Sequence, residues 1–119
     1  MAPLFDNGTS LGHERFTNHV SRWTDVDYQR YISKGKHHVK WSLKDPVQGH
    51  IALLQRALEQ WPDTREAAHA KLNFSSDDLS YAVVDLPKLN AVTPLSNERL
   101  KFMLRLMSYR LTLLKALFL

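Results

Sequence analysis

Apolar residues recur every three or four positions along most of this chain, and polar or turn-forming residues separate the recurring stretches. Such spacing is the period of an α-helix that buries one face. It predicts helices that begin near residues 24, 46, 63, 75 and 96. Residues 36–42 are expected to form a loop or a short extended piece, and residues 87–95 a loop. The chain is therefore predicted to be mainly α-helical.

Starting and stopping signals support these helices. Thr24 and Ser75 are each followed three residues later by an aspartate, as in a capping box. Asp45-Pro46 joins a carboxylate cap to a proline at the first helical position, which makes it the clearest predicted start. Ser96 is the expected cap of the last helix. The expected stops are Gly35, Pro62 and Pro87.

The helix predicted after Asp45 has one apolar face that is expected to pack inward. Its members are Val47, Ile51, Leu54, Leu58 and Trp61. His50 lies on or near this face and is expected to be a partly buried packing residue. Trp23 and Trp41 are expected in the core together with Trp61.

The last predicted helix is apolar over more than half of its circumference. One stripe consists of Leu100, Met103, Leu104, Met107, Leu111, Leu114 and Phe118, and a second of Phe102, Leu106, Tyr109, Leu113 and Leu117. Arg110 falls inside the apolar sector. Such a helix needs neighbouring helices on two sides. The four shorter predicted helices can cover one side readily, and a second side less readily. The chain is therefore expected to be short of packing partners.

Composition narrows the class of protein. The 119 residues match one ordinary domain, and an apolar share of 44% is typical of a folded chain. There is no cysteine, which excludes disulfides, thiolate metal sites and a cysteine nucleophile. The sequence shows neither a secretory signal pattern nor an uninterrupted apolar run of the ~18 residues that span a bilayer. We expect a cytoplasmic protein that contacts no membrane.

The opening residues carry the most specific candidate chemistry. Residues 2–5 have the pattern of a short apolar strand that delivers Asp6 into a tight turn, where Asn7-Gly8 can take the positive φ. A carboxylate at the end of a strand suits a metal–phosphate site, because Mg²⁺ prefers hard oxygen ligands. An aspartate before Asn-Gly is also a common turn residue whose side chain bonds its own backbone. The turn alone leaves both interpretations of Asp6 open.

Together with its flanks, this turn resembles a known family. The run Ala-Pro-Leu-Phe-Asp-Asn-Gly-Thr-Ser-Leu-Gly at residues 2–12 is similar to the segment that follows the catalytic loop in HipA-like kinases. His37-His38-Val39-Lys40-Trp41 is similar to a His-His-x-x-Trp stretch of one subgroup of that family. Leu95-Ser96, followed by a leucine-rich helix with arginines, is similar to the family's usual ending. The likeness covers most of the chain, specifically at the first two motifs and loosely between them.

The resemblance implies the helical C-lobe portion of a protein-kinase-like fold, with a short extended N-terminal segment. Residues 1–119 would form a partial kinase domain, with a metal-binding strand and turn at 1–12 and a helical subdomain at 24–119. Asp6 would hold Mg²⁺ against the phosphates of ATP, and Phe5 would lie beside the adenine. A protein substrate, a HipB-like antitoxin partner and a toxin–antitoxin setting are implied in the same way.

Phosphoryl transfer also needs a phosphate-binding lysine, backbone donors around the phosphates and a catalytic-loop aspartate. No G-x-G-x-x-G, P-loop or His-x-Asp motif occurs in residues 7–119. No catalytic residue is therefore assigned. We expect this chain to be inactive alone, or to complete an active site together with a separately encoded N-terminal half.

The charge pattern supports an alternative of a different class. Sixteen Lys and Arg against twelve Asp and Glu give a net charge of +4. Residues 34–44 contain four lysines and no acid, and residues 99–119 contain five basic residues and no acid. Lysines on either side of Trp41 could track phosphates while the indole stacks a base. The alternative is a small basic helical module that binds nucleic acid or a partner protein without catalysis.

The six histidines do not have the spacing of a metal site. His13 and His19 are six residues apart, which on a helix points the two rings about 120° away from each other. His37 and His38 are adjacent and diverge on either regular structure. We interpret the histidines as surface or hydrogen-bonded structural residues.

Overall fold

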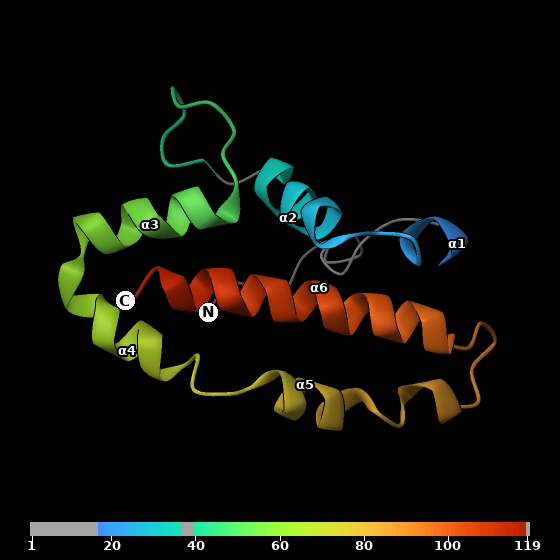
Figure 1. Cartoon of the computed structure of the whole chain (residues 1–119). Coiled ribbons are helices and arrows are strands. Elements are labelled where there is room, and N and C mark those ends of the chain that lie inside the picture. Colours follow the sequence, from blue (N-terminus) through green and yellow to red (C-terminus); the bar gives the residue numbers. More distant parts are fainter. Residues whose placement is uncertain (1–16, 37–39, 119) are drawn as a thin grey trace. The chain divides into compact units, whose positions relative to one another are not determined.

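The computed structural model describes residues 17–36 and 40–118, and every regular element within these ranges is helical (Figure 1). The α-helices are α1 (Thr17–Val20), α2 (Asp25–Lys34), α3 (His50–Gln60), α4 (Arg65–Ala70), α5 (Ser76–Val83) and α6 (Asn97–Ala116). Two 3₁₀ turns, η1 (Pro62–Thr64) and η2 (Leu86–Lys88), follow α3 and α5. The predicted mainly α-helical class is confirmed for the described residues. The extended segment and turn predicted at 1–12 lie outside them.

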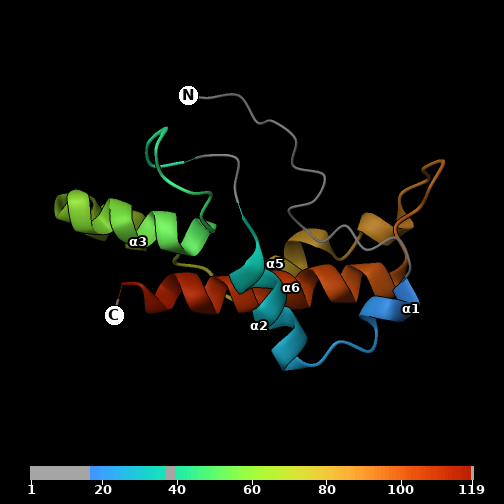
Figure 2. The ribbon, with the colours of Figure 1, turned by 90° about the horizontal axis from the view of Figure 1, so that it is seen from above.

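The described residues fall into two compact units. The first contains residues 17–23 and 75–108, and the second contains residues 24–36, 40–74 and 109–118. The longest helix, α6, contributes to both, because the division falls between Ser108 and Tyr109. Figure 2 shows α6 as one unbroken helix.

The first unit has a small core around the N-terminal half of α6. Phe102 and Leu106 are buried there, and Val20 at the end of α1 is only 2% exposed. Trp23 meets Phe102 edge to face, with ring centroids 5.1 Å apart and planes at 83°. This T-shaped geometry is the one aromatic quadrupoles favour.

The second unit is centred on α2, α3 and the C-terminal half of α6. Its buried side chains are Tyr28, Ile32, Leu58 and Leu111. The rings of Tyr28 and Tyr109 stack with centroids 5.3 Å apart and an angle of 16° between their planes. Burial of these apolar and aromatic groups is the main favourable contribution to the stability of this unit.

The expected shortage of packing partners for α6 is not observed. Each of its two predicted stripes includes buried residues: Phe102 and Leu106 in one, Leu111 in the other. Every other large apolar side chain from Leu100 to Phe118 is half-buried. Large apolar side chains are instead exposed along residues 81–92: Tyr81, Val84, Leu86, Leu89 and Val92. Exposed large apolar side chains thus occur on α5, on η2 and after them, and also at Val26, Leu43, Val47 and Trp61.

Three predicted caps are present. Asp27 Oδ2 accepts hydrogen bonds from the backbone N–H and the hydroxyl of Thr24, each at 2.8 Å. Ser75 and Asp78 form both halves of a capping box, with the Asp78 N–H donating to Ser75 Oγ at 3.1 Å. The N–H of Arg99 donates to Ser96 Oγ at 3.1 Å. These bonds satisfy backbone donors that the first turn of each helix leaves without an intrahelical partner.

The predicted start at Asp45-Pro46 is wrong. Helix α3 begins at His50 and its N-cap is Gly49, whose backbone is extended at φ −76° and ψ 158°. The Asp45 carboxylate accepts from Arg56 Nη1 at 3.3 Å instead of capping a helix. A glycine inside a helix costs about 1 kcal/mol relative to alanine, so the helix starts after Gly49 at little cost. As a result Val47 stands in the loop and is 38% exposed.

Two short elements were not predicted. Helix α1 is four residues long and has no acidic residue in its first turn, so this helix-start signal is missing from the sequence. The predicted helix from Ser75 ends at Val83, and Pro87 lies within η2, not in the loop expected from residue 87 onward. The stop expected at Pro62 is confirmed, because α3 ends at Gln60 and η1 begins at Pro62.

Candidate functional site

The residues to which the sequence assigns a ligand, Phe5 and Asp6, lie outside the described residues. The same holds for His37, His38 and Val39 of the second motif, of which only Lys40 and Trp41 are described. The metal and nucleotide assignments therefore stay predictions.

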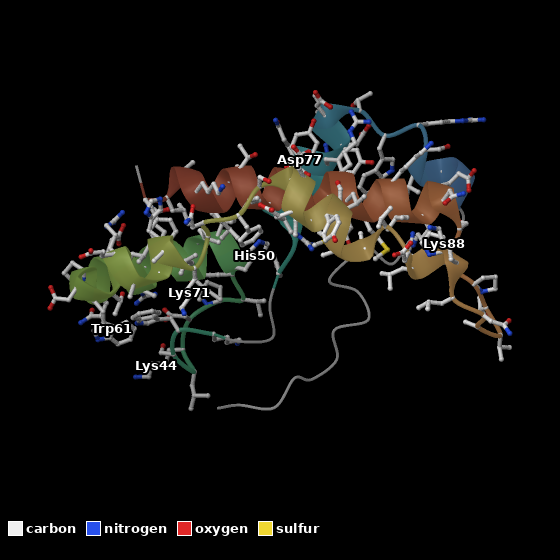
Figure 3. All side chains as sticks on the ribbon, turned by 90° about the horizontal axis from the view of Figure 1, so that it is seen from below. Lys44, His50, Trp61, Lys71, Asp77 and Lys88 are labelled. Atoms are coloured by element: carbon white, nitrogen blue, oxygen red, sulfur yellow. The ribbon has the colours of Figure 1, made fainter. Side chains whose placement is uncertain are left out.

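The most distinctive cluster is a tryptophan pair formed by Trp41 and Trp61 in the second unit. Their ring centroids are 5.5 Å apart, and the ring planes are tilted by 37°. Trp61 is 55% exposed, whereas Trp41 is half-buried. Figure 3 labels Trp61 at the end of α3 and Lys44 on the loop before α3. The expectation that Trp61 belongs to the core is therefore wrong.

Local backbone structure explains why Trp61 is held in this position. It is the C-cap of α3, and its N–H donates to the Ala57 carbonyl at 2.9 Å. Pro62 prevents the helix from continuing. The Trp61 carbonyl then accepts from both the N–H and the hydroxyl of Thr64, at 3.1 and 2.7 Å. The C-cap residue of α3 is thereby held by backbone hydrogen bonds on both sides, at the junction of α3 and η1.

Arg56 links the pair to the loop before α3. Its guanidinium carbon lies 4.7 Å from the centroid of the Trp41 ring, within the range of a cation–π interaction. Its Nη1 also pairs with Asp45 Oδ2 at 3.3 Å, and 42% of the Arg56 side chain stays exposed. Arg56 therefore stacks on Trp41 and pairs with Asp45 at the same time, which restricts the positions of these two loop residues.

The surface around the tryptophan pair is charged. Lys40 and Lys44 of the loop are exposed, and Leu43 between them is 98% exposed. Glu59 and Asp63, which flank Trp61 along the chain, are exposed as well. The loop side of the pair is thus basic, and the α3–η1 side carries carboxylates.

Shifted pKa values do not mark a catalytic group among the described residues. The pKa of Asp27 is lowered, mainly by the hydrogen bond from the Thr24 backbone and then by the Thr24 hydroxyl, so this shift belongs to the helix cap. The pKa of Arg110 is lowered by desolvation, partly offset by the Coulombic effect of Tyr31. Arg110 is half-buried within the apolar sector, where the sequence places it.

Within residues 17–36 and 40–118 there is no group of three or more His, Asp or Glu side chains placed to hold a metal ion. His50 is half-buried as predicted, and His69 packs its ring against Phe118 with centroids 5.7 Å apart. A structural role for His69 is therefore supported by its contact.

Among the described helices, none has both the length and the apolar character needed to cross a membrane. Comparison of the chain with protein-family models, with curated proteins and with solved structures finds no match.

Proposed function

We propose that this chain is the metal-binding turn and helical portion of a HipA-like serine/threonine kinase. In this proposal Asp6 holds Mg²⁺, and Phe5 lies beside the adenine of ATP. The single observation that supports it is the run at residues 2–12, which combines the Asp-Asn-Gly turn with flanks similar to the family on both sides. The mainly helical architecture and the long, serine-capped α6 agree with the helical lobe that such a kinase requires.

The roles proposed for this chain and for an N-terminal kinase half follow from the chemistry of phosphoryl transfer. Transfer of a phosphoryl group depends on positioning and on neutralising charge around the phosphates. Asp6 would supply one hard oxygen ligand for the metal, which is the part of the task a carboxylate at a tight turn can perform. The phosphate-binding lysine, the glycine-rich loop and the catalytic-loop aspartate would come from an N-terminal kinase half. A protein substrate and a HipB-like antitoxin belong to the same proposal.

The test is Mg²⁺-dependent ATP binding by this chain mixed with the N-terminal half of a HipA-like kinase. Isothermal titration with and without Mg²⁺ measures the metal-dependent part of the affinity. Asp6→Ala is expected to remove that part, because the metal loses its carboxylate ligand. Asp63→Ala is the matched control, since Asp63 is an exposed aspartate of η1 and should leave binding unchanged. Unchanged Mg²⁺-dependent binding in Asp6→Ala would show that Asp6 is not the metal ligand.

A further inference from the structure

An exposed indole beside a second indole is the least expected feature of the described surface. Trp61 is 55% exposed, although burying its large ring would favour folding. The Trp41 ring lies beside Trp61 at a centroid distance of 5.5 Å, and more than half of Trp61 still stays exposed. We propose that the tryptophan pair, with Arg56, Lys40 and Lys44, binds single-stranded nucleic acid. This proposal does not depend on the kinase proposal.

The pair is suited to stacking because it is fixed before any ligand arrives. Arg56 lies over Trp41 at 4.7 Å and is itself held by Asp45 at 3.3 Å. The C-cap of α3 and the two bonds from Thr64 fix the backbone of Trp61. A base that stacks on Trp61 therefore meets a ring whose position is already restricted, which lowers the ordering cost of binding.

The charges around the pair favour a polyanion over an apolar partner. Lys40 and Lys44 are exposed on the loop that carries Trp41, and residues 34–44 contain no acid. A protein partner that buried Trp61 would also have to remove water from the charged side chains around it, including Glu59 and Asp63, and this desolvation is costly. A single strand makes use of both features, because its bases stack on aromatic rings and its phosphates pair with lysines. We expect the backbone to run on the Lys40–Lys44 side, away from the carboxylates.

The first test is binding of fluorescein-labelled oligo(dT) and oligo(U) to the full chain, measured by anisotropy at low salt. Trp61→Ala is expected to weaken binding about 5- to 150-fold, the range produced by losing one stacked base. Trp61→Phe keeps an aromatic face and should lose less than Trp61→Ala. Tyr81→Ala is the matched control, because Tyr81 is an 85% exposed aromatic residue of the other unit. Circular dichroism verifies that each variant keeps its helices.

The second test separates phosphate contacts from stacking. Lys44→Ala is expected to reduce the slope of log affinity against log salt by about 0.7, the value for one phosphate contact on a single strand. Lys88→Ala removes an exposed lysine from the other unit and should leave the slope unchanged. The proposal is overturned if the wild-type chain does not bind either oligonucleotide. It is also overturned if Trp61→Ala binds as tightly as wild type, or if base-free polyphosphate competes as well as oligo(dT).

Discussion

Arg65 Nη1 donates to the main-chain carbonyl oxygen of Leu117 at 2.7 Å, which joins the first residue of α4 to the C-terminal end of α6. The last carbonyls of a helix have no intrahelical donor, and a cation is favoured at this end of the helix dipole. Lys115 Nζ of α6 also donates to the main-chain carbonyl of Phe74, in the segment between α4 and α5, at 2.6 Å. Both bonds lie within the second unit.

Arg65→Ala is expected to lower the free energy of unfolding by about 1.5–3 kcal/mol, the usual contribution of a hydrogen bond to a charged group. The half-buried Leu117 carbonyl would lose its donor. Urea unfolding followed by circular dichroism measures the change. Arg22→Ala, which removes an exposed arginine, serves as the control and is expected to stay within about 0.5 kcal/mol of wild type. Equal stabilities for the two variants would contradict a capping role for Arg65.

Gly49→Ala is expected to destabilise the second unit by about 1–3 kcal/mol, the cost of forcing an extra group into a closed space. A Cβ at Gly49 would lie 2.8 Å from the carbonyl oxygen of Gly35, which is backbone and cannot rotate away. Thermal unfolding of the variant measures the loss.

Gly35→Ala is the matched control for Gly49→Ala. Its Cβ would meet the Ile32 and Tyr31 carbonyls at 3.4 Å, an ordinary contact, and its φ of −59° is open to alanine. Stability should stay the same or rise by up to about 1 kcal/mol, because alanine restricts the unfolded chain. If Gly35→Ala proved the more damaging of the two, the close approach at Gly49 would not be the reason for its glycine.

The contact between Gly49 and Gly35 also explains why the start of α3 could not be predicted from sequence. Asp45-Pro46 has the residues typical of a helix start. Such local preferences do not take into account that the Gly35 backbone passes close to Gly49. The caps at Thr24, Ser75 and Ser96 were predictable because their partners are three residues away in sequence. Caps formed between residues close in sequence could be predicted, whereas the approach of Gly35 to Gly49, which lie far apart in sequence, could not.

The same distinction holds for the tryptophan pair. The sequence shows Trp61 as the last member of an apolar helical stripe, which favours burial. Its surroundings depend on Pro62 following the end of the helix and on the loop that brings Trp41 to it, where Arg56 of α3 lies over the Trp41 ring. The proline was visible in the sequence, but the arrival of a loop from sixteen or more residues earlier was not. Asp6 and Phe5, which carry the sequence-based proposal, lie outside the described residues.

Ser75→Ala is expected to lower the free energy of unfolding by about 1 kcal/mol, the typical loss for an N-cap hydroxyl. The Asp78 N–H would lose its acceptor at 3.1 Å, and the Asp78 carboxylate would lose the hydroxyl donor at 2.8 Å. Hydrogen exchange of the α5 amides measures the local loss. Ser76→Ala is the control at the next, exposed position inside the helix, where alanine is a better helix former and stability should not fall.

Acidification is expected to weaken the start of α2 through Asp27. The folded-state pKa of this carboxyl is lowered below its ordinary value of 3.8 by the two donors on Thr24, so its charged form is the stabilising one. A lowered pKa contributes stability that is fully present above the unfolded value and is lost as pH falls through the folded value. The stability difference between wild type and Asp27→Asn should therefore be constant near neutral pH and shrink below 3.8. Thr24→Ala, which removes the hydroxyl donor and keeps the backbone donor, should show an intermediate pH dependence. Urea unfolding midpoints across this range measure both variants, and a difference that did not change with pH would show that the Asp27 charge contributes nothing to the cap.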